Sequence, residues 1–335
     1  MNDFRNNPLS DKIVCALINA TESYAKVNVL LNEFPSTKSA LSVFLLSLDI
    51  YYSFYYAKPD ILQICRNLYI QDQNSDITGI VDVISKCTKY ANKKEQTTYV
   101  LTAIDLFRID RAISTVSIAP LMVDDSSTEP EYKIEAVWTV LHNIYGPQRQ
   151  YPLLLETSIA VCKLYLFSSE YRFNMQTLII LLSILYKNKF AFQGLHRQWV
   201  LSTDPRLDLD TLAYEDAIIH VLSVFQQMWE HLITLIRSIN NKRDEISKLI
   251  HIEPFRQLSA GFYELLAENV CIRNKDVTEK LCVSSKTAIK NLKQLEQEQI
   301  LSAVKKGREL FYFNNLFLDL LKQSIEVSDN GTKKP

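Results

Sequence analysis

Apolar residues recur every three or four positions along most of the chain, the spacing that places them on one face of an α-helix. Ser10 can cap a segment with this period, which ends at the helix-breaking Pro35-Ser36-Thr37. Leu41–Tyr56 is apolar on nearly every side, and Pro59-Asp60 begins a further helix. We therefore predict a helical region over residues 1–118.

Residues 119–132, which hold two prolines and a Ser/Thr/Asp cluster, form the clearest interruption. Helical spacing resumes beyond it and ends in a long amphipathic segment, roughly Asp208–Ile250, which can break near Asn240-Asn241. Its apolar side chains lie within about 60° of Ile218 on a helical wheel. They are Ile218, Val221, Leu222, Phe225, Trp229, Leu232 and Ile236. A second helical domain is predicted over residues 119–250.

After Pro254 the pattern changes to short elements. We expect helices at Phe255–Asn269, Lys275–Leu281, Ser285–Glu298 and Leu316–Gln323, with a short extended Cys271-Ile272 after the first. Asn274 and Ser284 are the expected caps of the second and third helices. Strands are expected at Leu301–Lys305 and Glu309–Phe313, joined by a turn that contains Gly307. This order is typical of a winged helix-turn-helix, here spanning residues 255–325 before a polar tail, 326–335.

The predicted recognition helix, Ser285–Glu298, has two unlike faces. Ala288, Leu292 and Leu295 share one face, with Ile289 beside them, and are expected to pack on Leu265, Val277 and Leu281. The opposite face and the wing carry side chains that reach phosphates and base edges. The predicted DNA contacts are Ser285, Lys286, Thr287, Lys290, Asn291, Lys293, Lys305, Lys306 and Arg308.

Charge sharpens this prediction. The whole chain has a formal net charge of −1, yet residues 271–310 hold nine Lys or Arg against five Asp or Glu. A basic C-terminal module is expected for a protein that binds double-stranded DNA. The alternative is a winged helix that only packs against protein, with solvated lysines. No interleaving of basic and aromatic residues points to RNA or single-stranded nucleic acid.

Composition excludes other classes. The six glycines are so dispersed that no two lie within ten residues of each other, which excludes the glycine-rich turns that bind dinucleotides or nucleoside triphosphates. The six cysteines include no C-x-x-C pair, as expected for reduced thiols of a cytoplasmic protein. No apolar run is long enough to span a membrane, so we expect no membrane association.

The segment VTEKLCVSSKTAIKNLKQLEQEQILSAVKKGRELFYFNNLFLDLL resembles the winged helix that follows the catalytic domain in many bacterial Fic-domain proteins. Upstream, Pro152–Phe167 is similar in position to the central Fic helix, and the resemblance covers roughly residues 110–325. It implies a multi-helical Fic-like bundle followed by the winged helix with its small two-stranded wing. The family usually has glycines before the recognition helix and before the first wing strand, where this chain has Cys282 and Gln299. Both positions can be left-handed, at a cost of about 1 kcal/mol for a non-glycine residue.

The resemblance also implies that catalysis is lost. Fic activity depends on a loop with a histidine base, an acidic magnesium ligand, glycines that cradle phosphates, and an arginine. In the matching stretch, residues 165–173, Tyr165 stands for the histidine, Ser169 for the acid, and Glu170 and Arg172 for glycines. A tyrosine is a poor general base at pH 7 because its pKa is near 10. We therefore expect no enzyme activity, no catalytic residue and no cofactor.

Other candidate sites are weak. Asp216 and His220 lie one turn apart on the polar face of the long helix, which His231 shares eleven residues further on. No third strong ligand is near this pair on the helix, so no metal is expected. Cys162 lies on an apolar helix and is expected to be a buried, inert thiol.

The sequence thus predicts a mainly α-helical, cytoplasmic DNA-binding protein, a transcriptional regulator on a catalytically degenerate Fic-like scaffold. The helical part would supply dimerisation or a protein-partner surface. Two alternatives stay open: a divergent Fic-like nucleotidyl (AMP) transferase, and a catalytically dead protein-interaction module.

Overall fold

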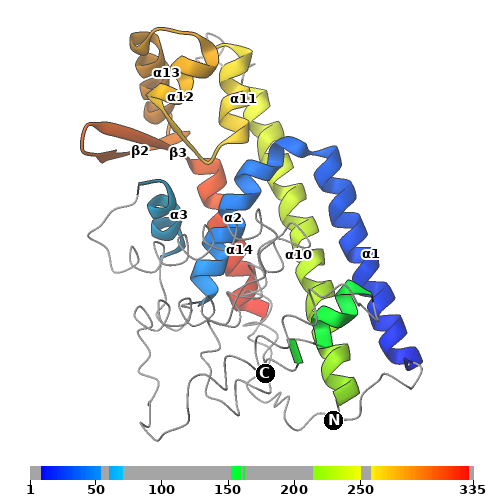
Figure 1. The fold of residues 1–335 in the computed structure, drawn as a ribbon. Helices are drawn as coiled ribbons and strands as arrows, with labels where there is room; N and C mark the ends of the chain where they lie inside the picture. The colour runs from blue at the N-terminus through cyan, green and yellow to red at the C-terminus, as the bar shows by residue number, and fades with distance from the viewer. Residues whose placement is uncertain are drawn as a thin grey trace, which may run out of the picture. The chain divides into compact units, whose positions relative to one another are not determined.

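The computed structural model describes residues 9–53, 60–70, 152–159, 161–162, 214–249 and 258–331. These residues are mainly helical and include a small three-stranded antiparallel sheet, which confirms the predicted helical class. Figure 1 shows the elements in chain order from α1 to α14. They group into two compact units, residues 1–26 with 79–230, and residues 27–78 with 231–335, so each unit joins two separate stretches of the chain.

α1 (Asp11–Glu33) and α10 (Tyr214–Lys248) begin in the first unit, beside each other, and both continue into the second. The Ser10 hydroxyl accepts from the Ile13 N–H, as a cap does, and donates to the Glu215 carboxylate. Tyr24 and Phe225 both contact the Trp229 ring, with centroid distances of 5.1 Å and 6.0 Å. The predicted apolar stripe of α10 is buried from Ile218 to Ile236, which confirms the periodicity.

One expectation for α10 is wrong, because the helix does not break at Asn240-Asn241 and runs on to Lys248. A local interaction stabilises this turn, since the side-chain amide oxygen of Asn240, Oδ1, accepts from the Arg243 guanidinium at 3.4 Å, one turn later. Ile239 and Ile246 on either side are fully buried, so the apolar face continues past the two asparagines.

The second unit holds the C-terminal elements and two helices from the N-terminal part of the chain. A short 3-10 turn, η2 (Pro35–Thr37), leads into α2 (Lys38–Ser53), and α3 (Ile61–Ile70) follows. The Asp60 carboxylate caps α3 by accepting from the Leu62 N–H at 2.9 Å. Phe44 of α2 meets Phe317 of α14 edge to face, with centroids 6.2 Å apart, so α2 shares a core with the C-terminal helix.

The C-terminal elements follow the predicted order. The helices are α11 (Ala260–Glu268), α12 (Asn274–Leu281), α13 (Ser285–Gln297) and α14 (Asn315–Gly331). The strands are β1 (Cys271–Arg273), β2 (Leu301–Lys306) and β3 (Glu309–Asn314). β1 pairs with β3 on the side away from β2, so the sheet order is β1-β3-β2. The extended Cys271-Ile272 is thus a third strand, beyond the expected two-stranded hairpin, and α14 extends into the stretch that we expected to be a polar tail.

The cap of α12 differs from the prediction. Arg273 ends β1 in an extended conformation, and the Asp276 carboxylate accepts from its backbone N–H at 2.8 Å. Asn274 is therefore the first helical residue rather than the cap, because β1 continues directly into α12. The Asn274 amide instead donates to the Ser285 hydroxyl at 2.7 Å and ties the starts of α12 and α13 together.

No helix in the described part of the chain is long and apolar enough to cross a membrane.

Candidate nucleic-acid interface

A short turn with a left-handed residue sets the start of α13. Cys282 ends α12 with φ +53°, a conformation that favours glycine, so the chain turns sharply between the two helices. The Ser284 hydroxyl then accepts from the Thr287 N–H at 3.1 Å, which confirms Ser284 as the cap of α13. Gln299 after α13 is also left-handed, with φ +59°, as the resemblance implies.

The apolar face of α13 holds the helix on the unit. Ala288, Leu292 and Leu295 are fully buried, and α13 packs on α12 and β2. Gly261 lets α11 and α12 approach closely, since a Cβ there would lie 3.0 Å from Leu281. The expectation for Ile289 is wrong, because the residue is 39% exposed. Ile289 lies about 90° round the helix from the centre of the buried face and so cannot reach the core.

The opposite face of α13 is basic. Lys286, Lys290 and Lys293 are spaced i, i+4, i+7, so their side chains fall within about 60° of one another on the helix. The centre of this stripe lies about 160° from the centre of the buried face. All three lysines are exposed. The face that points away from the core is therefore the face that carries the positive charge.

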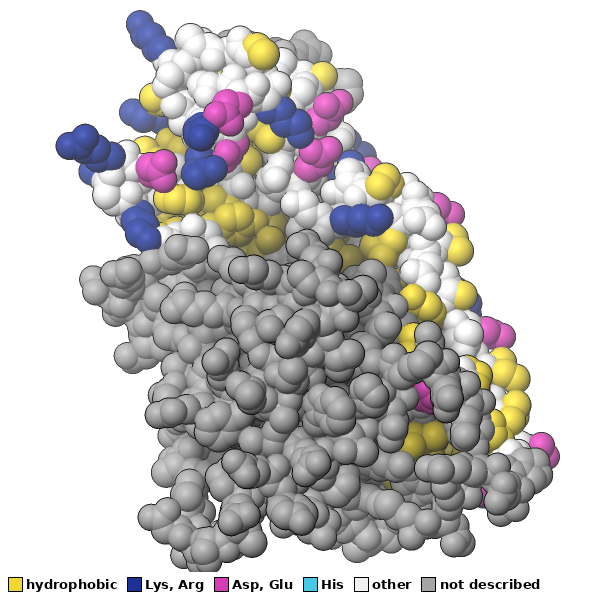
Figure 2. All heavy atoms as spheres, in the orientation of Figure 1, with side chains coloured by type: hydrophobic (Ala, Val, Ile, Leu, Met, Phe, Trp, Pro, Cys, Tyr) yellow, Lys and Arg dark blue, Asp and Glu magenta, His cyan; other side chains and the backbone are white. Residues whose placement is uncertain are grey.

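The cations on and beside α12 form ion pairs with neighbouring carboxylates. Three pairs lie on or beside α12: Arg273–Asp276 at 3.0 Å, Lys280–Glu268 at 2.7 Å and Lys275–Glu279 at 3.5 Å. In contrast, no carboxylate among the described residues pairs with the three lysines of α13, or with Lys305 and Arg308 of the β2–β3 hairpin. The cations without a carboxylate partner in the described part of the chain are Lys286, Lys290, Lys293, Lys305 and Arg308. Figure 2 shows Lys and Arg side chains projecting outward at this end of the unit.

The hairpin presents its cations in different directions. Side chains alternate between the two faces of a strand, so Lys305 and Lys306 point to opposite faces. Lys305 lies opposite Leu310, on the sheet face that includes Tyr312. Burial raises the pKa of Tyr312, and the charge of Glu296 raises it further, so Glu296 of α13 lies near this face. Lys305 therefore shares its face with α13. Gly307 takes φ +58° in the turn, as expected for a tight hairpin.

The other sheet face meets α3. Lys306 is on the side of Phe311 and Phe313, and Tyr69 of α3 packs edge to face on Phe313 with centroids 5.8 Å apart. The Lys306 ammonium donates to the backbone carbonyl of Ile70, the last residue of α3. Lys306 is thus exposed, but its ammonium contacts protein.

Of the other predicted contacts, Ser285 and Thr287 are exposed and Asn291 is half-buried. Ser285 accepts from Asn274, and the Thr287 hydroxyl lies 2.9 Å from the Ser284 hydroxyl. These hydroxyls contribute to the start of the helix as well as to its exposed surface. The involvement of Asn274 and of α3 was missed, because neither contact follows from the periodicity of a single segment.

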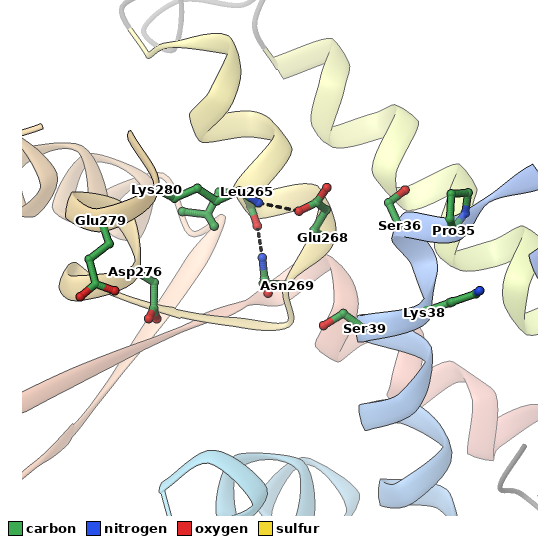
Figure 3. Close-up of a pocket in the computed structure, with 10 residues that line it drawn as sticks. All are labelled: Pro35, Ser36, Lys38, Ser39, Leu265, Glu268, Asn269, Asp276, Glu279 and Lys280. Carbon is green, nitrogen blue, oxygen red and sulfur yellow. Dashed lines mark hydrogen bonds and ion pairs between the residues drawn. The ribbon is translucent and has the colours of Figure 1, made fainter. Parts of the chain in front are cut away.

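A hollow of about 790 Å³ lies between the start of α2 and the helices α11 and α12. Figure 3 shows Ser36 and Ser39 on one side of it and Glu268 and Asn269 on the other, while Lys38 points away. Its acidic residues, Glu268, Asp276 and Glu279, all belong to the ion pairs of α12. The hollow is lined by none of the predicted DNA contacts.

The structure also describes two residues of the weaker candidate sites, Cys162 and His220. Burial raises the pKa of the Cys162 thiol to about 12, which keeps it protonated and inert, as predicted. Burial lowers the pKa of His220. No cluster of three metal-ligating side chains occurs within the described ranges. The Fic-like loop, residues 165–173, lies outside the described residues, so its predicted loss of function stays a prediction.

Comparison with known proteins gives no family. No protein-family model matches the chain, and no curated protein matches it.

Proposed function

We propose that this protein binds double-stranded DNA through a winged helix-turn-helix formed by α11–α14 and the three strands, with α13 as recognition helix and the β2–β3 hairpin as wing. The element order α11-β1-α12-α13-β2-β3 and the left-handed turn at Cys282 support this fold. A regulator of transcription is the function that such a module most commonly serves. The Fic-like origin of the helical part stays a prediction.

One observation carries the proposal: Lys286, Lys290 and Lys293 form a stripe opposite the buried face of α13, and no carboxylate of the described chain neutralises it. A helix used only for packing needs its apolar face, and gains nothing from three like charges in adjacent turns. Like charges at i, i+4 destabilise a helix by a few tenths of a kcal/mol. An anionic ligand such as the DNA backbone offsets that repulsion and releases its own counterions.

Charge reversal tests the proposal. Lys286→Glu and Lys290→Glu are each expected to abolish binding of the full-length protein to a mixed pool of duplex DNA, measured by fluorescence anisotropy. Lys322→Glu is the matched control, because Lys322 is an exposed lysine on α14 and its substitution changes the net charge equally. If both α13 variants bind as the wild type does, α13 is not the DNA-contacting helix. If the wild type itself does not bind, the proposed function is wrong.

A further inference from the structure

The β2–β3 hairpin is supported by a helix from the N-terminal part of the chain. α3 lies beside the hairpin in Figure 1, and the Tyr69–Phe313 ring contact joins the two directly. Tyr69 is half-buried, and burial raises the pKa of its phenol, while its partner Phe313 is fully buried. Ile64 and Cys65 of α3 are fully buried as well. The base of the hairpin therefore packs on α3, while its tip, residues 305–310, is exposed.

At the end of α3 the contact with the hairpin is a hydrogen bond rather than apolar packing. The last four carbonyl groups of a helix have no partner within it and carry the negative end of the helix dipole. The Lys306 ammonium donates to one of them, that of Ile70. Lysine is well suited to this position because it supplies both a hydrogen bond and a positive charge.

We propose that Lys306 is a positioning residue: it fixes the hairpin to the C-terminus of α3, while Lys305 and Arg308 are the residues of the hairpin that contact phosphate. The proposal rests on the proposed function for the role of Lys305 and Arg308, but the anchoring of Lys306 does not depend on DNA. Lys305 lies on the α13 face of the hairpin and Arg308 in its turn, and neither has a carboxylate partner among the described residues. Lys306 faces the other way, toward α3.

The two neighbouring lysines make a matched pair for the test. In full-length protein, Lys306→Met, Lys306→Arg and Lys305→Met are compared by two measurements. The first is hydrogen exchange of the hairpin amides, residues 301–314, without DNA. The second is the slope of log K against log salt for duplex DNA, which changes by about 0.9 when a substitution removes one cation from the phosphate backbone.

Lys306→Met is expected to speed exchange of the hairpin by about two- to fivefold, the range for one cation at a helix C-terminus, and to leave the salt slope unchanged. Lys306→Arg restores slow exchange because arginine can still donate to the Ile70 carbonyl. Lys305→Met has the opposite profile, with wild-type exchange and a slope reduced by about 0.9.

A slope reduced by about 0.9 in Lys306→Met overturns the assignment, and so does unchanged exchange in that variant. If wild-type protein binds no duplex, the proposed function fails, and the assignment of phosphate contacts to Lys305 and Arg308 fails with it. The exchange rates of the three variants then still decide whether Lys306 anchors the hairpin.

Discussion

The orientation of α13 predicts a large difference between two apolar residues that lie three positions apart. Leu292 is fully buried, whereas Ile289 is 39% exposed. Truncation of a fully buried leucine to alanine removes the transfer free energy of its side chain and leaves a cavity, a loss of about 3 kcal/mol. Truncation of Ile289 removes less buried area, and alanine has the higher helix propensity, so the expected loss is under about 1 kcal/mol.

Hydrogen exchange of the α13 amides measures this difference in the full chain, where the two units need not unfold together. Because 1.4 kcal/mol is a factor of ten, Leu292→Ala is expected to speed exchange by more than about 100-fold. Ile289→Ala is expected to speed it by less than about fivefold. Equal effects of the two variants would mean that α13 does not present the basic stripe to solvent, and the proposed interface would fail.

Three further predictions concern backbone strain, thiol reactivity and pH. Gly307→Ala is expected to cost about 1 kcal/mol in unfolding experiments through strain alone, because φ is +58° and a Cβ there meets nothing within 4 Å. Iodoacetamide at pH 8 is expected to modify exposed Cys15 while Cys65, whose pKa burial raises to about 12, stays unmodified in mass spectra. His220 has a lowered pKa in the fold, so the unfolded chain binds more protons and stability is expected to fall as the pH drops through about 6.5.

For each of these three predictions, one result would contradict it. A Gly307→Ala variant as stable as the wild type would show that the turn adopts another conformation. Equal modification of Cys65 and Cys15 would contradict the burial of α3. For His220, the control is His220→Gln, which is expected to reduce the loss of stability between pH 7 and pH 5; an identical loss in wild type and variant would assign it to other groups.

Local features of the C-terminal module could be predicted from the sequence. The cap at Ser284, the buried face of α13 and the turn at Gly307 all follow from spacing and from the conformational preferences of single residues. The left-handed conformations of Cys282 and Gln299 were implied by the resemblance, since the family usually has glycine there. The basic stripe likewise needs only the helical period and the charges.

Long-range contacts could not be predicted in this way. Periodicity shows that α3 has an apolar face, but not that Tyr69 would meet Phe313, more than two hundred residues later. Pairing of β1 with β3 converts Arg273 into the cap of α12, a change that the Asn274 side chain alone does not signal. Helical spacing predicted Ile289 beside the core, but spacing alone does not show how wide the buried face of α13 is. That width depends on how much of the helix α12 and β2 cover, and they leave Ile289 exposed.

The salt dependence of duplex binding tests the central claim most directly. Five cations on α13 and the hairpin have no carboxylate partner in the described chain: Lys286, Lys290, Lys293, Lys305 and Arg308. If each contacts one phosphate, log K falls with log salt at a slope of about −4.5, and affinity drops about 500-fold between 50 and 200 mM salt. A slope near that value, reduced by about 0.9 in Lys293→Met, is the predicted result. Affinity that does not change with salt would contradict the account.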